Sequence, residues 1–152
     1  MNAFRSAIAV LAGLGLIPLV TELLETTLVY AVAGGQVSDL STYFAIRNQP
    51  GILGAKLVYS TVAAILGGFV TARVAGRREM RHAALAATLK TLALIWGFTS
   101  DEYAQFTPAW MRVALVLLTA PGIMAGAAIR ARAATASTRV GAGFSEPEQE
   151  HK

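Results

Sequence analysis

The chain has 152 residues, of which 55% are hydrophobic and only 14% charged, and its formal net charge is +4. Because ordinary globular domains carry about 25% charged residues, this composition excludes a typical water-soluble domain and indicates a membrane protein. The sequence contains no cysteine, which excludes disulfides, thiolate metal sites and thiol catalysis. The basic residues cluster beside apolar stretches, so the positive charge indicates membrane orientation and not nucleic-acid binding.

Four apolar stretches follow one another, and each approaches the ~20 residues that cross ~30 Å of hydrocarbon as a helix. They run over residues 6–32, 54–74, 82–99 and 110–129. The first stretch is interrupted by Pro18, Glu22 and Glu25. A cleavable signal peptide is the alternative for it, but such a peptide has a shorter apolar region without these charges. The sequence therefore predicts an all-α, polytopic membrane protein, a four-transmembrane-helix bundle in residues 1–132.

Arginine placement predicts the orientation of the four spans. Arginines precede the first span, fill the link between the second and third, and follow the fourth: Arg5; Arg73, Arg77, Arg78 and Arg81; Arg130, Arg132 and Arg139. The other two links show no basic excess. Because cytoplasmic loops are enriched in Lys and Arg, both ends of the chain and the 73–81 link are predicted to lie in the cytoplasm.

The outer link over residues 34–53 is long enough to hold a short helix in the plane of the membrane interface. Ser38 is expected to cap this helix. The face that would lie in the interface consists of Leu40, Tyr43, Phe44 and Arg47. An irregular loop is the alternative. After the fourth span the chain becomes rich in Ala, Thr and Ser and then in Glu, so residues 133–152 are predicted to form a disordered cytoplasmic tail.

Small residues recur at a spacing of four in the second span: Ala64, Gly68, Ala72 and Gly76. Gly122 and Gly126 repeat this spacing in the fourth span. Such rows let helix backbones approach closely, which is how helices associate in lipid. Two interpretations stay open, an interface with a partner or second copy, and internal packing of a tight four-helix bundle.

Charged side chains inside the apolar spans are the main functional signal, because a buried ion in hydrocarbon costs several kcal/mol. Glu22 and Glu25 share one helical face, and Lys90 lies in the middle of the third span. At 1.5 Å per residue these three lie roughly 14–18 Å below the outer boundary, so a Glu–Lys bridge is geometrically possible. Lys56 and Arg112, nearer the outer edge, can join this cluster or snorkel to the interface.

Three interpretations of this cluster compete. It is a structural ion pair that fixes helix register, a proton- or ion-handling site in a transporter, or a docking surface for another membrane subunit. The basic link over residues 73–81 likewise has two interpretations, contact with anionic lipid head groups and a plain orientation signal. No nucleophile stands beside a base, and no phosphate loop or metal-ligand set is visible. Neither an enzyme nor a bound cofactor or metal is therefore expected.

At residues 67–78 and at His82-Ala83 the chain resembles a broad group of small, uncharacterised bacterial inner-membrane proteins. Members share a glutamate in the first span, which Glu22 or Glu25 would match, a Gly-Gly-x-x-(Ala/Thr)-Ala-Arg-x-Ala-Gly stretch and a His-Ala start to the third span. The likeness covers about two thirds of the chain and departs at Lys90 and in residues 96–110. The resemblance implies four spans in a bacterial cytoplasmic (inner) membrane and implies no activity.

These features together predict a non-enzymatic protein that acts through packing with itself or with a larger membrane assembly. The alternative is a small oligomeric transporter or channel that uses Glu22, Glu25 and Lys90 for proton or ion handling. The expected partners are the lipid bilayer and either further copies or other membrane subunits, and not nucleic acid. A polar cavity that reaches Glu22 would favour transport, whereas a closed ion pair with a bare small-residue row would favour assembly.

Overall fold

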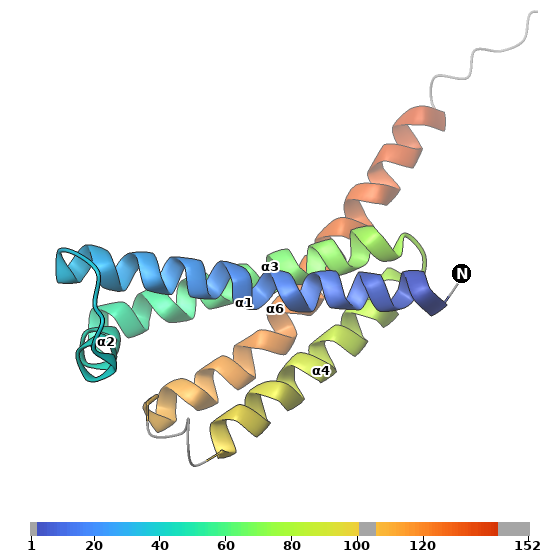
Figure 1. Cartoon of the computed structure of the whole chain (residues 1–152). Helices are drawn as coiled ribbons and strands as arrows, with labels where there is room; N and C mark the ends of the chain where they lie inside the picture. The colour runs from blue at the N-terminus through green and yellow to red at the C-terminus, as the bar shows by residue number, and fades with distance from the viewer. Residues whose placement is uncertain (1–2, 101–105, 143–152) are drawn as a thin grey trace, which may run out of the picture.

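The computed structural model describes residues 3–100 and 106–142, and these residues fold into five helices (Figure 1). The helices are α1 (Ala3–Ala33), α2 (Leu40–Arg47), α3 (Pro50–Ala75), α4 (Glu79–Thr99) and α6 (Ala109–Ala142). The predicted all-α class is confirmed for these ranges. Each of the four predicted apolar stretches lies inside one long helix, and α2 is the short helix of the outer link.

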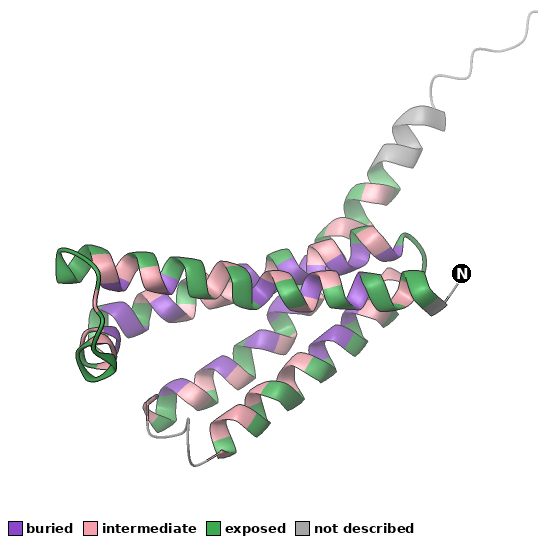
Figure 2. Ribbon diagram, viewed as in Figure 1, coloured by how far each residue is buried: buried purple, intermediate pink, exposed green. Residues whose placement is uncertain are grey.

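Three of these helices are long and apolar enough to cross a membrane. They are Phe4–Ala33 of α1, Pro50–Ala75 of α3 and Ala109–Ala136 of α6. Helix α4 is 21 residues long but is outside this set, because Lys90 and several threonines lower its mean hydropathy. Many large apolar residues of the long helices are exposed, as contact with lipid requires. Figure 2 shows that exposed residues lie along the whole length of these helices.

Helix α3 is central, since it packs against each of the other four helices. Helix α1 runs along one side of α3 and also contacts α4, whereas α6 packs against α3 and α4. Helix α2 lies at one end of this arrangement, and the start of α1 lies at the opposite end, together with the turn between α3 and α4 (Figure 1). The end of α6 projects away from the other helices (Figure 1).

Backbone conformation explains where α3 begins and how the chain turns from α3 into α4. Pro50 begins α3, where its fixed φ suits the first helical turn. Gly76 ends α3 with φ +65°, a left-handed conformation that a glycine adopts without steric penalty. Arg78 is the N-cap residue just before α4. Its φ is +53°, a conformation that is unusual for a residue with a side chain.

Asp39 caps α2, so the prediction that Ser38 does so is wrong. The Asp39 carboxylate accepts the Thr42 N–H at 2.8 Å and the hydroxyls of Ser41 and Thr42. These hydrogen bonds, that of Ser41 foremost, lower the pKa of Asp39 from 3.8 to about 2. A lowered carboxyl pKa means that the cap is fully present above about pH 4 and is lost as the pH falls through about 2.

Helix α6 continues to Ala142, although the sequence predicts a disordered tail from residue 133. Alanine is the commonest residue over 131–142 and has the highest helix propensity of all residues. The helix therefore extends well past the predicted fourth span. Residues 143–152, the rest of the predicted tail, lie outside the described residues.

Glycines set the close crossing of α3 and α6. A Cβ atom added to Gly68 in α3 would overlap the backbone carbonyl of Ile123 in α6. A Cβ added to Gly126 in α6 would overlap the backbone carbonyl of Ile65 in α3 in the same way. Only glycine lets the two backbones come this close, as small residues do between helices in lipid.

The other predicted helix-packing residues divide into two groups. Ala64, Ala72 and Gly122 are buried, and a Cβ on Gly122 would lie 3.0 Å from that of Ala64. Gly76, in contrast, is exposed at the end of α3. Buried residues gather where α3 crosses α1 and α6 (Figure 2). The small-residue rows are therefore used inside a single chain, which is the second of the two interpretations given above.

Candidate functional site

Glu25 is the most deeply buried acidic side chain of the described residues, at 4% exposure. Its Oε1 atom lies 2.8 Å from Arg47 Nε, and its Oε2 atom forms an ion pair with Lys56 Nζ. The Tyr59 hydroxyl donates to Oε2 at 3.1 Å. One carboxylate is thus held between α1, α2 and α3 by two cations and a phenol.

Arg47 connects this carboxylate to the segment that precedes α6. Its Nη2 atom donates to Thr107 Oγ1 at 3.1 Å, and its Nη1 atom donates to the Phe106 carbonyl at 3.4 Å. Asn48 Nδ2 donates to the same carbonyl at 3.2 Å. The Phe44 ring stacks on Phe106 with centroids 4.4 Å apart. Helix α2 and the residue after it therefore tie the segment just before α6 to the carboxylate on α1.

The role of Arg47 was not predicted, because the sequence assigns it to the surface of an interfacial helix. The available signal was its location in an outer link, where basic residues are disfavoured. An arginine that is retained there, on a short helix with aromatic neighbours, needs a partner. Its 8% exposure shows that it is buried and not anchored in the interface.

A pocket of about 220 Å³ lies beside this ion cluster, between α1, α3, α4 and α6. Charged and hydroxyl side chains form its polar lining: Thr21, Glu22, Arg47, Lys56, Ser60, Lys90 and Thr119. The remaining walls are apolar. Three cations and one carboxylate line the pocket itself, so its formal charge is positive and stays positive when the neighbouring Glu25 carboxylate is also counted. The pocket brings together Glu22, Lys90 and Lys56, three residues of the predicted cluster.

Lys90 does not form the ion pair that its depth suggests. It is half-buried in α4 and interacts electrostatically with Glu22. Both salt bridges within the described ranges go to Glu25, however, and Lys90 takes part in neither. Lys56 reaches Glu25 instead, because α1 packs much more extensively against α3 than against α4.

Arg112 lies apart from the cluster. Its Nη1 atom donates to the carbonyl of Phe98 at 2.9 Å and so ties α6 to the end of α4. The sequence left open whether Arg112 joins the charges or anchors at the interface. The structure gives it a third role, as a link between two neighbouring helices.

The Ser60 hydroxyl in the pocket lining is buried and has no hydrogen-bond partner among the residues that the structure describes. Thr119, by comparison, satisfies its hydroxyl on the Leu115 carbonyl at 2.6 Å. Buried hydroxyl groups are nearly always hydrogen-bonded, so Ser60 favours a polar occupant of the pocket. Within residues 3–100 and 106–142 no three His, Asp or Glu side chains gather as a metal-ligand set. The charged and hydroxyl side chains that line the pocket can exchange protons and recognise charge.

Comparisons with known proteins add no family to this description. No family model matches the chain, and searches of curated proteins and of solved structures find no match. The resemblance carried by residues 67–78 and His82-Ala83 stays a prediction.

Proposed function

We propose that the protein is a small transporter or channel of a bacterial cytoplasmic membrane, with four spans and both ends of the chain in the cytoplasm. The pocket at Glu22 and Lys90 would bind and pass protons or a small ion. The observation that carries this proposal is the polar pocket among apolar helices, lined by the Glu22 carboxylate, which has no salt bridge among the described residues. Ionisable side chains within spans usually line ion or proton pathways.

Glu22 and Glu25 suit different roles. Glu25 is neutralised by two cations and a hydroxyl, so it supports the structure of the cluster. Glu22 is exposed and has no salt bridge in the described part of the chain, so its proton can exchange. Lys90, across the pocket, is the nearby charge that would respond to the protonation of Glu22.

The faces of α4 support its assignment as the fourth span. Lys90 shares a face with Ala83 and Ala87, which are buried against the other helices. The opposite face presents Leu85 and Leu89 outward. A helix with its charge facing the bundle and leucines facing outward suits a bilayer despite its modest hydropathy.

A second candidate function, packing with further copies or with a larger membrane assembly, is supported by α6. The last part of this helix projects beyond the other helices, where another subunit could contact it (Figure 1). The small-residue rows give this function no support, because they are buried within the chain. The two candidates are separated by the effect of pocket variants on ion flux.

Glu22→Gln is expected to lower proton flux at least tenfold in vesicles that contain the purified protein and a pH-sensitive dye. The substitution keeps the size of the side chain but removes its exchangeable proton. Glu79→Gln, at the start of α4 and away from the pocket, is the matched control and should retain the flux. Equal flux in both variants, or no flux above that of empty vesicles, would exclude transport through this pocket.

The four-span topology makes a separate prediction for reporters fused after successive helices. Reporters after Arg77 and after Arg139 should be cytoplasmic, whereas one after Ser100 should be external. The comparison between Arg77 and Ser100 isolates α4, which lies between them. If these two reporters lie on the same side, α4 does not span and the proposal fails.

A further inference from the structure

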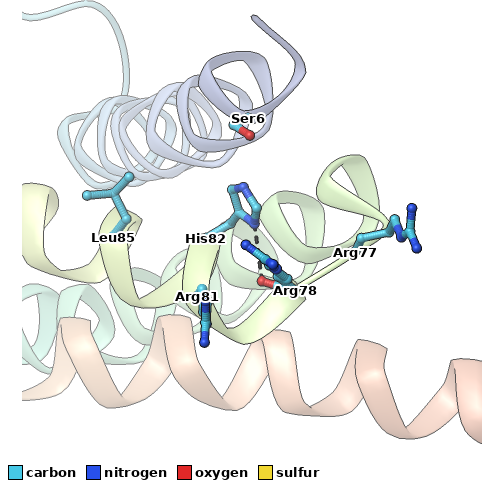
Figure 3. A pocket seen from close by; sticks show the side chains of 6 residues that line it. All are labelled: Ser6, Arg77, Arg78, Arg81, His82 and Leu85. Atoms are coloured by element: carbon cyan, nitrogen blue, oxygen red, sulfur yellow. Dashed lines mark hydrogen bonds between the residues drawn. The ribbon is translucent and has the colours of Figure 1, made fainter. Parts of the chain in front are cut away.

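We infer that the arginine-lined pocket at the opposite end of the molecule holds the phosphate of an anionic phospholipid, with an acyl chain along α4. This pocket has a volume of about 560 Å³ and is formed where the start of α1 faces the α3–α4 turn. Its lining is Ser6, Arg77, Arg78, Arg81, His82 and Leu85 (Figure 3). The inference is independent of the proposed function of the Glu22 pocket.

The positive charge of this pocket is balanced only in part by nearby acids. Arg77, Arg78 and Arg81 are exposed, and none of them forms a salt bridge in the part of the chain that the structure describes. Glu79 does not line this pocket, but it lines a neighbouring hollow together with the same three arginines, so it offsets part of their charge. Three guanidinium groups beside one carboxylate still leave a positive site for an oxyanion, because arginine binds phosphate in a forked, two-hydrogen-bond geometry.

Other donors surround the same space. The Ser6 hydroxyl faces the arginines from α1, and the His82 ring lies beside Arg78, its Nδ1 atom 3.1 Å from the Arg78 carbonyl oxygen (Figure 3). The first turn of α4 also begins here, and helix N-termini attract anions through their free N–H groups. The pocket thus combines side-chain cations, a hydroxyl and a helix end.

The apolar surface next to the pocket favours a lipid over a soluble phosphate. Leu85 lines the pocket and begins a row of exposed side chains on α4, which are Leu85, Leu89, Leu92 and Trp96. Their spacing of four, three and four residues places them on one face of the helix. The row extends about 16 Å at 1.5 Å per residue. A phosphate in the pocket would therefore leave an acyl chain lying along this row.

The location also fits an anionic lipid. The pocket lies at the end of the molecule where the arginines cluster, which is the cytoplasmic end in the proposed topology. Anionic lipids give the cytoplasmic leaflet a negative surface potential that attracts basic segments close to a span. Orientation alone requires basic residues but does not require a pocket that three arginines line together with a serine and the first leucine of an apolar row.

The test is titration of the detergent-purified full chain with phosphatidylglycerol and with phosphatidylcholine, followed by native mass spectrometry. Phosphatidylglycerol should bind in preference to phosphatidylcholine. Arg77→Gln with Arg81→Gln should weaken phosphatidylglycerol binding about 30-fold, from roughly 1 kcal/mol per arginine and tenfold per 1.4 kcal/mol. Arg73→Gln with Arg132→Gln removes the same charge outside the pocket and should change binding less than threefold.

A second pair of measurements separates lipid from free phosphate. Leu85→Ser with Leu89→Ser should weaken phosphatidylglycerol binding without altering the arginines, and millimolar inorganic phosphate should not displace the lipid. Displacement by inorganic phosphate, with no effect of the leucine changes, would assign the pocket to a soluble phosphate and overturn the lipid proposal. If the two arginine double variants lose phosphatidylglycerol binding equally, the lipid is attracted by the overall positive charge of this end and not by a defined pocket, and the proposal is wrong.

Discussion

Glu25→Gln is expected to destabilise the protein by roughly 3–5 kcal/mol, because it leaves two buried cations without their shared counterion. Arg47 and Lys56 are 8% and 6% exposed, so neither can regain solvation without local unfolding. The loss should be measured as the free energy of unfolding in mixed detergent. Glu22→Gln provides the matched control on the same helix and should change stability little, because Glu22 is exposed and has no salt bridge among the described residues.

Combined variants test whether the effect comes from the unpaired cations. Removing all the partners of a buried ion pair can be nearly neutral, whereas removing one is not. Lys56→Met added to Glu25→Gln should therefore restore part of the stability, and Arg47→Met added to both should restore more. Strict additivity of the three single effects would show that these side chains do not interact. The restoration should be incomplete, since Arg47 also holds Thr107.

Gly68→Ala is expected to destabilise the protein by about 2–3 kcal/mol, the upper part of the range for overpacked cores. The added methyl group would meet the backbone of Ile123, and a backbone carbonyl cannot rotate away as a side chain can. Helix α6 would have to move away from α3 along their whole contact. The midpoint of thermal unfolding in detergent measures this effect.

Gly54→Ala is the matched control for this change. It lies on the same helix, and its added methyl group would meet nothing within 4 Å. Its unfolding midpoint should therefore stay close to that of the unsubstituted chain. Similar midpoints for the Gly54 and Gly68 variants would contradict the close crossing of α3 and α6.

Much of the fold could be predicted from the sequence, because apolar length and small-residue spacing are local signals. The long helices, the short α2 helix and the row that includes Gly68 all follow from such signals. The ends of the helices are harder to predict from the sequence. The side chain that accepts from a free N–H group of α2 is that of Asp39, one residue after the predicted Ser38. The end of α6 depends on helix propensity, which weighs against the low-hydrophobicity signal for disorder.

The partners of Glu25 could not be predicted, for a geometric reason. Counting residues from a span boundary gives the depth of a side chain but not the direction in which its helix face points. Depth favours Lys90 as the partner and places Lys56 nearer the outer edge, and only the packing of α1 against α3 selects Lys56. The contact of Arg47 with Glu25 is still harder to predict, because it depends on how α2 folds back towards the other helices.

The shared carboxylate of Glu25 has a consequence for how the chain enters a bilayer. An isolated lysine or arginine is costly within a span, by roughly 2.5–3.5 kcal/mol at its centre on insertion scales. Lys56 lies nearer the start of α3 but is buried, and α3 would carry it in alone if helices entered one at a time. Because Glu25 lies on α1 and is the acceptor for Lys56, entry of α1 and α3 as a hairpin would neutralise both charges on the way. Biogenesis of this protein should thus be most sensitive to the timing of its first helical hairpin, well before α6 has been synthesised.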